Sequence, residues 1–200
     1  MVKRETDSAT RALCDKWNQR YLSCDSSPPP ASVLVENLYL LPSSGRALDL
    51  ACGLGAGALL LAEHGLDVTA WDLSPIAIER LRQESRLRGF NIKAQVRDVC
   101  RRPPSPETFD VILVSHFLER ALAPALSDAL RPAGLLFYQT FSGEAVPDCG
   151  PSNPAFRLAT NELLGLFQAL VVRFYREEGR RGNSALGIRG VAQLVAQKPW

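Results

Sequence analysis

Features that would mark several classes of protein are missing from this sequence. No apolar run is long enough to span a bilayer, and the basic residues near the start are not followed by the apolar core of a signal peptide. The cysteines number five and contain no C-x-x-C pair, which argues against a disulfide framework and against a zinc site. Arginines are mixed with acids along the chain, so the net charge of +2 does not come from a basic block. We therefore expect a cytoplasmic protein with no membrane, metal or nucleic-acid partner and with reduced thiols at Cys14, Cys24, Cys52, Cys100 and Cys149.

The composition that is present fits one globular domain. Hydrophobic residues make up 46% of the 200 residues and charged residues 22%, which allows a continuous buried core without disulfides. Near the start, Leu13, Trp17 and Tyr21 recur four residues apart, which places them on one face of a helix. Prolines at positions 28–30 then exclude both helix and sheet. We expect a lid helix with a proline-rich linker at residues 1–30 and a single domain at residues 31–200, as a monomer or a homodimer.

Strand-like and helix-like segments alternate from residue 46 onward. A buried strand, a glycine loop and a helix ending at Gly65 are followed by a second strand and by a helix with Ser74 as its N-cap and Pro75 in its first turn. The last two strands are joined by a turn rich in Gly and Arg, which predicts a hairpin. The pattern predicts an α/β fold, a Rossmann-like three-layer sandwich with a mostly parallel seven-stranded sheet and an antiparallel C-terminal strand. The predicted strands are residues 46–51, 66–72, 91–99, 109–115, 134–141, 171–177 and 190–197, and short helices are expected at 31–40 and 160–170.

The glycine loop after the first strand is the first candidate for a binding site. Gly53, Gly55 and Gly57 lie between a strand and a helix, where glycines let the backbone approach a ligand and turn sharply. Such loops bind nicotinamide and flavin nucleotides as well as S-adenosylmethionine, and some are only structural turns. The loop by itself therefore indicates a nucleotide site without identifying the nucleotide.

Acidic residues at successive strand ends narrow the class of ligand. Asp72 ends the second strand, where its carboxylate can accept hydrogen bonds from both hydroxyls of a ribose. Asp98 follows the third strand, where it can meet an adenine edge, and Asp49 lies inside the first strand, where it is expected to brace the loop or the ligand's amino group. Taken alone, Asp72 or Asp98 fits a turn or a helix cap equally well. Because open α/β sheets bind ligands at the carboxyl ends of their strands, we expect these groups to form one site.

The run ALDLACGLGAG at residues 47–57, followed by an acid after each of the next two strands, resembles the class I S-adenosylmethionine-dependent methyltransferases. The resemblance implies S-adenosylmethionine as the cofactor and S-adenosylhomocysteine as the product. The segment WNQRY at 17–21 is similar to the W-x-x-R-Y helix of the tellurite-resistance (TehB-like) and thiopurine methyltransferases, which closes over the cofactor. Arg20 or Tyr21 would then approach the methionine end; the alternative is that the two aromatic rings only anchor the helix. The cofactor contacts implied by the resemblance are Trp17, Arg20, Tyr21, Asp49, Ala51, Gly53, Gly55, Asp72, Leu73, Asp98, Val99 and Ser115.

The acceptor side of the implied site is less distinctive. His116 follows the fourth strand, whose end faces the transferred methyl group in this family, and is the candidate for a general base; a histidine that only lines the pocket fits as well. No N-P-P-Y-like element stands there, which argues against the enzymes that methylate amino groups of DNA, of glutamine and of many RNAs. Arg157 is a candidate for holding an anionic acceptor or for capping a helix. The expected substrate pocket, which includes the end of the fifth strand, comprises His116, Phe117, Tyr138, Thr140, Phe141 and Arg157.

The predicted function is methyl transfer to a small molecule that is a soft nucleophile, such as a thiol, selenite or tellurite. A sulfonium leaving group asks the protein for alignment and exclusion of water rather than for an acid–base pair. Three alternatives remain open. A nicotinamide-dependent oxidoreductase would carry G-x-G-x-x-G, whereas residue 58 is Ala after a G-x-G-x-G run. The others are a regulatory module that binds the cofactor without turnover, and an RNA or protein methyltransferase.

Overall fold

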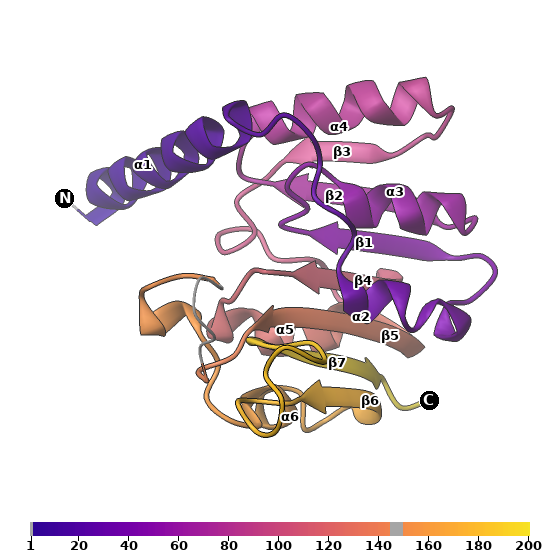
Figure 1. Cartoon of the computed structure of the whole chain (residues 1–200). Helices are drawn as coiled ribbons and strands as arrows, with labels where there is room; N and C mark the ends of the chain where they lie inside the picture. Colours follow the sequence, from indigo (N-terminus) through magenta and orange to yellow (C-terminus); the bar gives the residue numbers. More distant parts are fainter. Residues whose placement is uncertain (1, 145–149) are drawn as a thin grey trace.

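A mixed sheet forms the centre of the molecule (Figure 1). The computed structural model describes residues 2–144 and 150–200, with the side chains of residue 8 and of residues from 10 onward; Cys149, expected as a reduced thiol, lies outside the described residues. Within that part of the chain the sheet has seven strands in the order β3-β2-β1-β4-β5-β7-β6. Strands β1 to β5 run parallel, and β7 is antiparallel to both of its neighbours, as predicted. The strands are β1 (Arg46–Leu50), β2 (Asp67–Asp72), β3 (Lys93–Val96), β4 (Phe109–Ser115), β5 (Leu130–Phe141), β6 (Val171–Glu177) and β7 (Val191–Gln197).

Helices cover both faces of this sheet, which gives the predicted three layers (Figure 1). One face packs against α2, α3 and α4 through a buried cluster that includes Leu34, Leu61 and Ile78. The other face packs against α5 and α6 through a second cluster that includes Leu126 and Leu163. The helices are α1 (Val2–Leu22), α2 (Ser32–Val35), α3 (Ala56–Glu63), α4 (Pro75–Leu87), α5 (Ala123–Ala129) and α6 (Glu162–Leu166), with short 3-10 turns η1 (Leu38–Leu40), η2 (Arg120–Leu122) and η3 (Pro154–Phe156).

The helix ends near the first two strands follow the local signals of the sequence. Gly65 has a φ of +88° just after α3, which is the left-handed position that ends a helix. Ser74 caps α4, because its Oγ accepts a hydrogen bond from the N–H of Ala77 at 3.2 Å, and Pro75 is the first residue of the helix. These two caps fix where the loops beside the glycine loop begin and end.

Several element boundaries differ from the prediction. The helix expected at 31–40 is broken into α2 and η1, because the Asn37 side chain donates to the Val33 carbonyl at 2.9 Å, and the side chain thus satisfies an acceptor of the last helical turn. Strand β3 ends at Val96, so Asp98 lies in the following turn and not at the strand end. Strand β5 starts earlier than expected, since Leu130 already pairs with β4 before a shift in register. The helix expected at 160–170 is confined to α6.

Helix α1 extends away from the rest of the molecule, and its C-terminal end meets the start of α4 (Figure 1). The apolar face predicted for this helix is therefore covered at one end only. Trp17 and Tyr21 are half-buried, whereas Leu13 is 48% exposed. None of the helices that the structure describes combines the length and the apolar character needed to cross a bilayer.

Candidate functional site

The loops that carry most of the predicted site residues leave the sheet at the carboxyl ends of its parallel strands. The chain passes from β1 outward to β2 and β3, then returns to β4 on the other side of β1. Ligands of open α/β sheets bind in the crevice outside such a switch point. In Figure 1 the arrowheads of β1 and β2 point toward the side on which α1 joins the fold. The topology therefore places the candidate site between the glycine loop, the end of β2 and the end of β4.

The glycine loop has a left-handed backbone at three positions. Gly53 and Gly55 have φ values of +53° and +81°, which glycine adopts without strain. Ala51, at the start of the loop, has a φ of +55°, where its Cβ approaches the following carbonyl oxygen. The loop thus makes a sharp turn into α3 and keeps one strained residue in doing so.

Two of the loop glycines are required by packing inside the protein. A Cβ on Gly55 would lie 2.3 Å from a methyl carbon of Leu81 on α4, and a Cβ on Gly57 would lie 2.4 Å from a methyl carbon of Leu113 on β4. Gly55 and Gly57 therefore let the loop and the start of α3 approach their neighbours closely. Gly53 differs, because the space beside it is bounded by the hydroxyl of Tyr21, 3.1 Å from where its Cβ would stand.

Asp72 ties the end of β2 to the glycine loop. The residue is 6% exposed, and its Oδ2 accepts the N–H of Gly53 at 2.9 Å while its Oδ1 accepts the N–H of Ser74 at 2.8 Å. Burial raises the pKa of Asp72, and the hydrogen bonds from these backbone groups oppose the rise. Each oxygen of an ionised carboxylate has room for a second donor, so Asp72 can brace the loop and still bind hydroxyl groups.

Asp49 is a buried carboxyl group on β1 that lacks a partner at one oxygen. The residue is 1% exposed, and its Oδ1 has no hydrogen-bond partner among the residues that the structure describes. Burial raises the pKa of Asp49 to about 7; the N–H of Ala58 at the start of α3 opposes the rise, and the charge of Asp72 adds to it. An unsatisfied buried carboxylate oxygen is unfavourable unless a donor reaches it. Asp49 therefore braces the start of α3 and leaves one acceptor for a ligand.

The end of α1 is fastened beside these groups. Asn18 Oδ1 accepts the hydroxyl of Ser74 at 2.5 Å, and the thiol of Cys14 lies 3.5 Å from the carbonyl oxygen of Leu73. Arg80 on α4 donates through Nη1 to the carbonyl oxygens of Tyr21 and Cys24, each at 2.7 Å. Residues from the loop after β2 and from α4 thus hold the last turns of α1 over the glycine loop.

Among the aromatic and basic residues of α1, only Tyr21 has a described contact with the glycine loop. Burial and the nearby Asp72 raise the pKa of its hydroxyl, which stays protonated. Trp17 stacks on Tyr21 with 5.8 Å between ring centroids, and the guanidinium of Arg20 lies 5.7 Å from the centroid of the Trp17 ring. The structure therefore brings Tyr21 to the loop, whereas Trp17 supports it and Arg20 stacks on its own helix.

The predicted residues after β3 and β4 lie at the carboxyl ends of strands on either side of β1, with β3 beyond β2 on one side and β4 on the other. Asp98 accepts the backbone N–H groups of Cys100 and Arg101 at 3.1 and 3.3 Å, so it caps its own turn. Val99 is 6% exposed and belongs to the core. Ser115 ends β4 and is half-buried. The structure thus shows Asp98 with a structural role, and its contact with an adenine stays a prediction.

His116 follows β4 with an unusual backbone. Its φ is +54°, and its N–H donates to the carbonyl oxygen of Gln139 on β5 at 2.7 Å. Its ring packs on Phe141 with 5.1 Å between centroids, and burial lowers the pKa of the imidazole. Although neighbouring groups cover part of the ring, His116 keeps an exposed surface, so a molecule at the carboxyl end of β4 can reach it.

The end of β5 divides into two sets of side chains, which corrects the predicted pocket. Tyr138 and Thr140 are 2% and 1% exposed, and the Tyr138 hydroxyl donates to the carbonyl oxygen of Phe117 at 2.9 Å. Successive side chains of a strand point to opposite faces, so Tyr138 and Thr140 face the α6 side, and Gln139 and Phe141 face His116. Tyr138 and Thr140 are core residues and do not line an open pocket.

Arg157 has a structural role that the sequence did not reveal. Its Nε donates to the carbonyl oxygen of Pro151 at 2.9 Å and its Nη1 to that of Ser142 at 3.0 Å. The guanidinium also lies over the Phe141 ring, 5.9 Å from its centroid. Arg157 therefore links Ser142 to Pro151, next to the aromatic ring that packs on His116.

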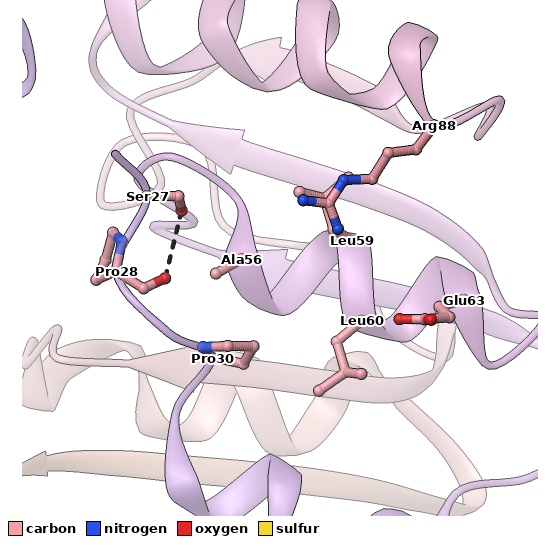
Figure 2. A pocket seen from close by; sticks show the side chains of 8 residues that line it. All are labelled: Ser27, Pro28, Pro30, Ala56, Leu59, Leu60, Glu63 and Arg88. Carbon is pink, nitrogen blue, oxygen red and sulfur yellow. Dashed lines mark hydrogen bonds between the residues drawn. The ribbon is translucent and has the colours of Figure 1, made fainter. Parts of the chain in front are cut away.

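A cleft elsewhere on the surface, of about 180 Å³, is shown in Figure 2. It runs along α3 beneath the proline-rich linker. None of the predicted site residues lines it, so it is separate from the candidate site. Its lining residues are Ser27, Pro28, Pro30, Ala56, Leu59, Leu60, Glu63 and Arg88.

Sequence comparisons find a match in the part of the chain that carries the loop. Residues 47–134 match the family described as a methyltransferase domain. The ubiquinone biosynthesis O-methyltransferase of Xylella fastidiosa (strain 9a5c) is 33% identical over 111 residues, which are 51% of this chain and 44% of that protein. The protein of the same description from Coxiella burnetii (strain Dugway 5J108-111) is 29% identical over 102 residues, 48% of this chain and 44% of its own. The chain thus spans less than half the length of these curated relatives.

Structural comparisons extend over nearly the whole chain. A solved structure reported as "Conversion of a Disulfide Bond into a Thioacetal Group during Echinomycin Biosynthesis" has a TM-score of 0.69 at 27% identity, covering 94% of this chain and 93% of that one. TehB from Haemophilus influenzae also has a TM-score of 0.69, at 20% identity, covering 92% of this chain and 66% of TehB. An S-adenosylmethionine-dependent methyltransferase from Mesorhizobium loti has a TM-score of 0.66 at 17% identity, covering 84% of this chain and 99% of its own.

Proposed function

Because the chain carries a methyltransferase domain on the fold of the class I S-adenosylmethionine-dependent enzymes, we propose that it transfers a methyl group from S-adenosylmethionine to a small molecule. The observation that carries this proposal is the meeting of Asp49, Gly53 and Asp72 outside the switch point of the sheet. A merely structural turn would not need a buried carboxylate with an unpaired oxygen beside it. A regulatory module without turnover would share this binding site, and the acceptor assays below separate the two.

The groups of the site fit the cofactor by their chemistry. The unpartnered Oδ1 of Asp49 is suited to a positively charged donor, such as the amino group at the methionine end. Asp72 retains acceptor capacity for ribose hydroxyls while its two backbone bonds fix its orientation. The left-handed backbone at Gly53 opens the loop to close approach. These residues would hold the cofactor at its methionine amino group and at its ribose.

When bound, the cofactor would supply a methyl group on a positively charged sulfur, which would leave as a neutral thioether once the acceptor's lone pair takes the methyl group. The protein's own contribution is alignment and exclusion of water. Tyr21 closes the space beside Gly53, and Arg80 holds the end of α1 there. We propose that residues 1–30 act as the lid of the site. His116, Phe117 and Phe141 lie on the acceptor side, after β4 and β5.

For the acceptor, we propose a soft nucleophile such as a thiol, selenite or tellurite. A thiolate or a chalcogen oxyanion needs no general base, so the site needs no acid–base pair for such an acceptor. The solved structure matched over 94% of this chain concerns the conversion of a disulfide bond into a thioacetal group, and that sulfur chemistry supports a sulfur acceptor. A hydroxyl acceptor is the second candidate, because the ubiquinone biosynthesis relatives are O-methyltransferases, although they match only about half of the chain.

Calorimetric titration with S-adenosylmethionine, S-adenosylhomocysteine and NAD tests the cofactor. We expect the first two to bind and NAD to give no heat of binding. Binding of NAD alone would overturn the proposal and would favour an oxidoreductase.

The substitution Asp72→Ala tests the site. We expect it to weaken binding of S-adenosylmethionine by about 1–3 kcal/mol, the range for lost hydrogen bonds to a charged group. Asp67→Ala is the matched control: Asp67 lies at the opposite end of β2, in an exposed ion pair with Lys93, and its loss should leave the affinity unchanged. Equal affinities for the two variants would mean that Asp72 does not bind the cofactor.

A radiolabelled-methyl assay with thiols, selenite, tellurite, phenols and carboxylates identifies the acceptor class. Transfer to sulfur, selenium or tellurium compounds but not to phenols is expected. Transfer to phenols alone would favour the O-methyltransferase alternative, and tight cofactor binding without transfer to any acceptor would favour a regulatory module.

A further inference from the structure

A buried hydrogen-bond network centred on Gln139 contacts the imidazole of His116. Gln139, on β5, is 5% exposed, and its side-chain amide is held from several directions. Its Oε1 accepts hydrogen bonds from the N–H of Val33 at 3.0 Å, from Ser32 Oγ at 2.9 Å and from Gln193 Nε2 at 2.9 Å. A backbone N–H can only donate, so the Gln139 atom that faces Val33 must be the oxygen. The orientation of the Gln139 amide is therefore fixed, with its nitrogen turned toward His116.

The fixed amide determines which nitrogen of His116 carries the proton. Gln139 Nε2 can only donate, and it lies 3.4 Å from His116 Nε2. The imidazole must therefore accept at Nε2, which leaves its proton on Nδ1. In an imidazolium, Nε2 of His116 would also carry a proton, and that N–H would face the N–H of Gln139. The network therefore disfavours the charged ring. Packing against Phe141 acts in the same direction, because burial of the ring lowers the pKa of His116.

Gln139 holds the backbone of His116 as well as its ring. The carbonyl oxygen of Gln139 accepts the His116 N–H at 2.7 Å, and His116 has a φ of +54°. A non-glycine residue persists in this left-handed conformation only where its surroundings fix it. The same strand residue thus sets the position, the orientation and the tautomer of the imidazole.

From this geometry we infer that Gln139 is a positioning residue that keeps His116 as a neutral hydrogen-bond donor, which offers Nδ1–H to a methyl acceptor that arrives as an anion. Among the described residues Nδ1 has no hydrogen-bond partner, and His116 is exposed at the carboxyl end of β4. A general base needs an unoccupied lone pair, and the lone pair of Nε2 is already used by Gln139. His116 therefore removes no proton from the acceptor.

This inference rests on the proposed function and narrows its substrate class. A donor without base function selects acceptors that are deprotonated at neutral pH, as aromatic thiolates and chalcogen oxyanions are. An aliphatic alcohol, which needs its proton removed, is excluded as a substrate. The hydrogen bond from Nδ1–H to the anion would orient the attacking lone pair without exchanging a proton.

Nitrogen-15 NMR of the histidine rings in the full chain tests the tautomer without any cofactor or acceptor. The chain has two histidines, and exposed His64 serves as the internal comparison. We expect His116 to be the neutral Nδ1–H tautomer at pH 7 to pH 8. A neutral Nε2–H tautomer, or an imidazolium at pH 7, would overturn the inference. This measurement is independent of the calorimetric titration, so failure of the tautomer and failure of the proposed function are distinguishable.

Two substitutions of His116 separate a donor from a base. His116→Asn keeps an N–H donor near the position of Nδ1 and tolerates the left-handed backbone, but it cannot act as a base. With 4-nitrothiophenol, which is a thiolate at pH 7, we expect His116→Asn to stay within about threefold of the wild-type rate and His116→Ala to lose about tenfold or more. An equal and large loss in both variants would indicate a general base, and His64→Asn is the control for an unrelated histidine.

The substitution Gln139→Glu tests the positioning role itself. A glutamate keeps an acceptor for Val33 N–H and turns a second oxygen toward His116 Nε2. We expect the ring proton to move to Nε2, or the imidazolium to persist above pH 7, in the same spectrum. Gln95→Glu, at an exposed position of β3, should leave His116 unchanged. An unaltered His116 in folded Gln139→Glu would overturn the positioning role, and if that variant does not fold, the wild-type spectrum decides the tautomer.

Discussion

At the scale of single residues, Ala51 shows how the loop turns out of β1. Its φ of +55° is a left-handed value that strains a residue with a Cβ and that glycine adopts freely. Ala51 comes two residues before Gly53, the glycine beside which the Tyr21 hydroxyl lies. The path of the backbone imposes this φ on Ala51, because Gly53 and Gly55 also have left-handed φ values in the same turn. A residue without a side chain at position 51 would follow this path more easily.

We predict that Ala51→Gly stabilises the protein by about 1 kcal/mol. The gain comes from relief of left-handed strain and is reduced by the larger conformational freedom of glycine in the unfolded chain. Urea unfolding monitored by circular dichroism measures the difference. Ala62→Gly, inside α3, should instead destabilise by about 1 kcal/mol, and a loss of stability in both variants would mean that Ala51 is not strained.

Asp49 gives the site a pH dependence with a definite sign. Burial raises the pKa of Asp49 to about 7, so the group is largely protonated at pH 5.5 and half ionised at pH 7 in the free protein. A cationic donor at Oδ1 favours the ionised form. We predict that the affinity for S-adenosylmethionine increases by about tenfold from pH 5.5 to pH 7, measured by calorimetry.

The substitution Asp49→Asn is the control for this dependence. The amide does not ionise, so the affinity should become nearly independent of pH over the same range. If the slope stays as steep in Asp49→Asn as in the wild type, another group is responsible. A slope of the opposite sign in the wild type would mean that no cation binds at Asp49.

At the scale of elements, α1 packs against the rest of the fold only near its C-terminal end, beside the candidate site. Its N-terminal end projects away from the rest of the molecule (Figure 1), Leu13 near its middle is 48% exposed, and its last turns are held by Arg80 and by the loop after β2. The carbonyl groups at a helix end lack partners within the helix, and Arg80 supplies two hydrogen bonds to that region. A helix attached in this way can open as a unit about its C-terminal end.

We predict that Arg80→Ala weakens binding of S-adenosylmethionine by about threefold to tenfold, because Tyr21 is no longer held beside Gly53. Amide hydrogen exchange at the end of α1 should become faster in the same variant. Arg86→Ala, at an exposed position of the same helix, is the matched control. Unchanged affinity together with faster exchange would show that α1 opens without affecting the cofactor site.

Strand β5 shows how one element divides its residues between two roles. The sequence predicts that the end of this strand lines the acceptor pocket, and in the structure alternate residues face opposite sides of the sheet. Gln139 and Phe141 face His116, whereas Tyr138 packs on Phe167 with 5.5 Å between ring centroids. The helices packed on each side of the sheet determine which set of alternating side chains faces His116 and which set is buried in the core.

At the scale of the whole molecule, the strand order explains why residues far apart in the sequence share one site. The return of the chain from β3 to β4 puts the ends of β1 and β4 side by side, and β7 enters antiparallel between β5 and β6. That insertion brings Gln193 against Gln139, and α2 brings Ser32 and Val33 to the same amide. The network that positions His116 therefore draws on three separate parts of the chain.

The sequence by itself determined the alternation of strands and helices, the caps at Ser74 and Gly65 and the glycine loop, because each depends on residues close together along the chain. It also predicted Asp49 and Asp72 beside that loop, since the ends of parallel strands must meet at one edge. Only the tertiary structure decided the roles of Asn18, Arg80 and Gln139, whose partners lie 56, 59 and 106 positions away. It also moved Tyr138, Thr140 and Arg157 into structural roles. A short sequence pattern carries no signal for such contacts, because they form only when the packing of distant elements fixes which face of each strand and helix a side chain occupies.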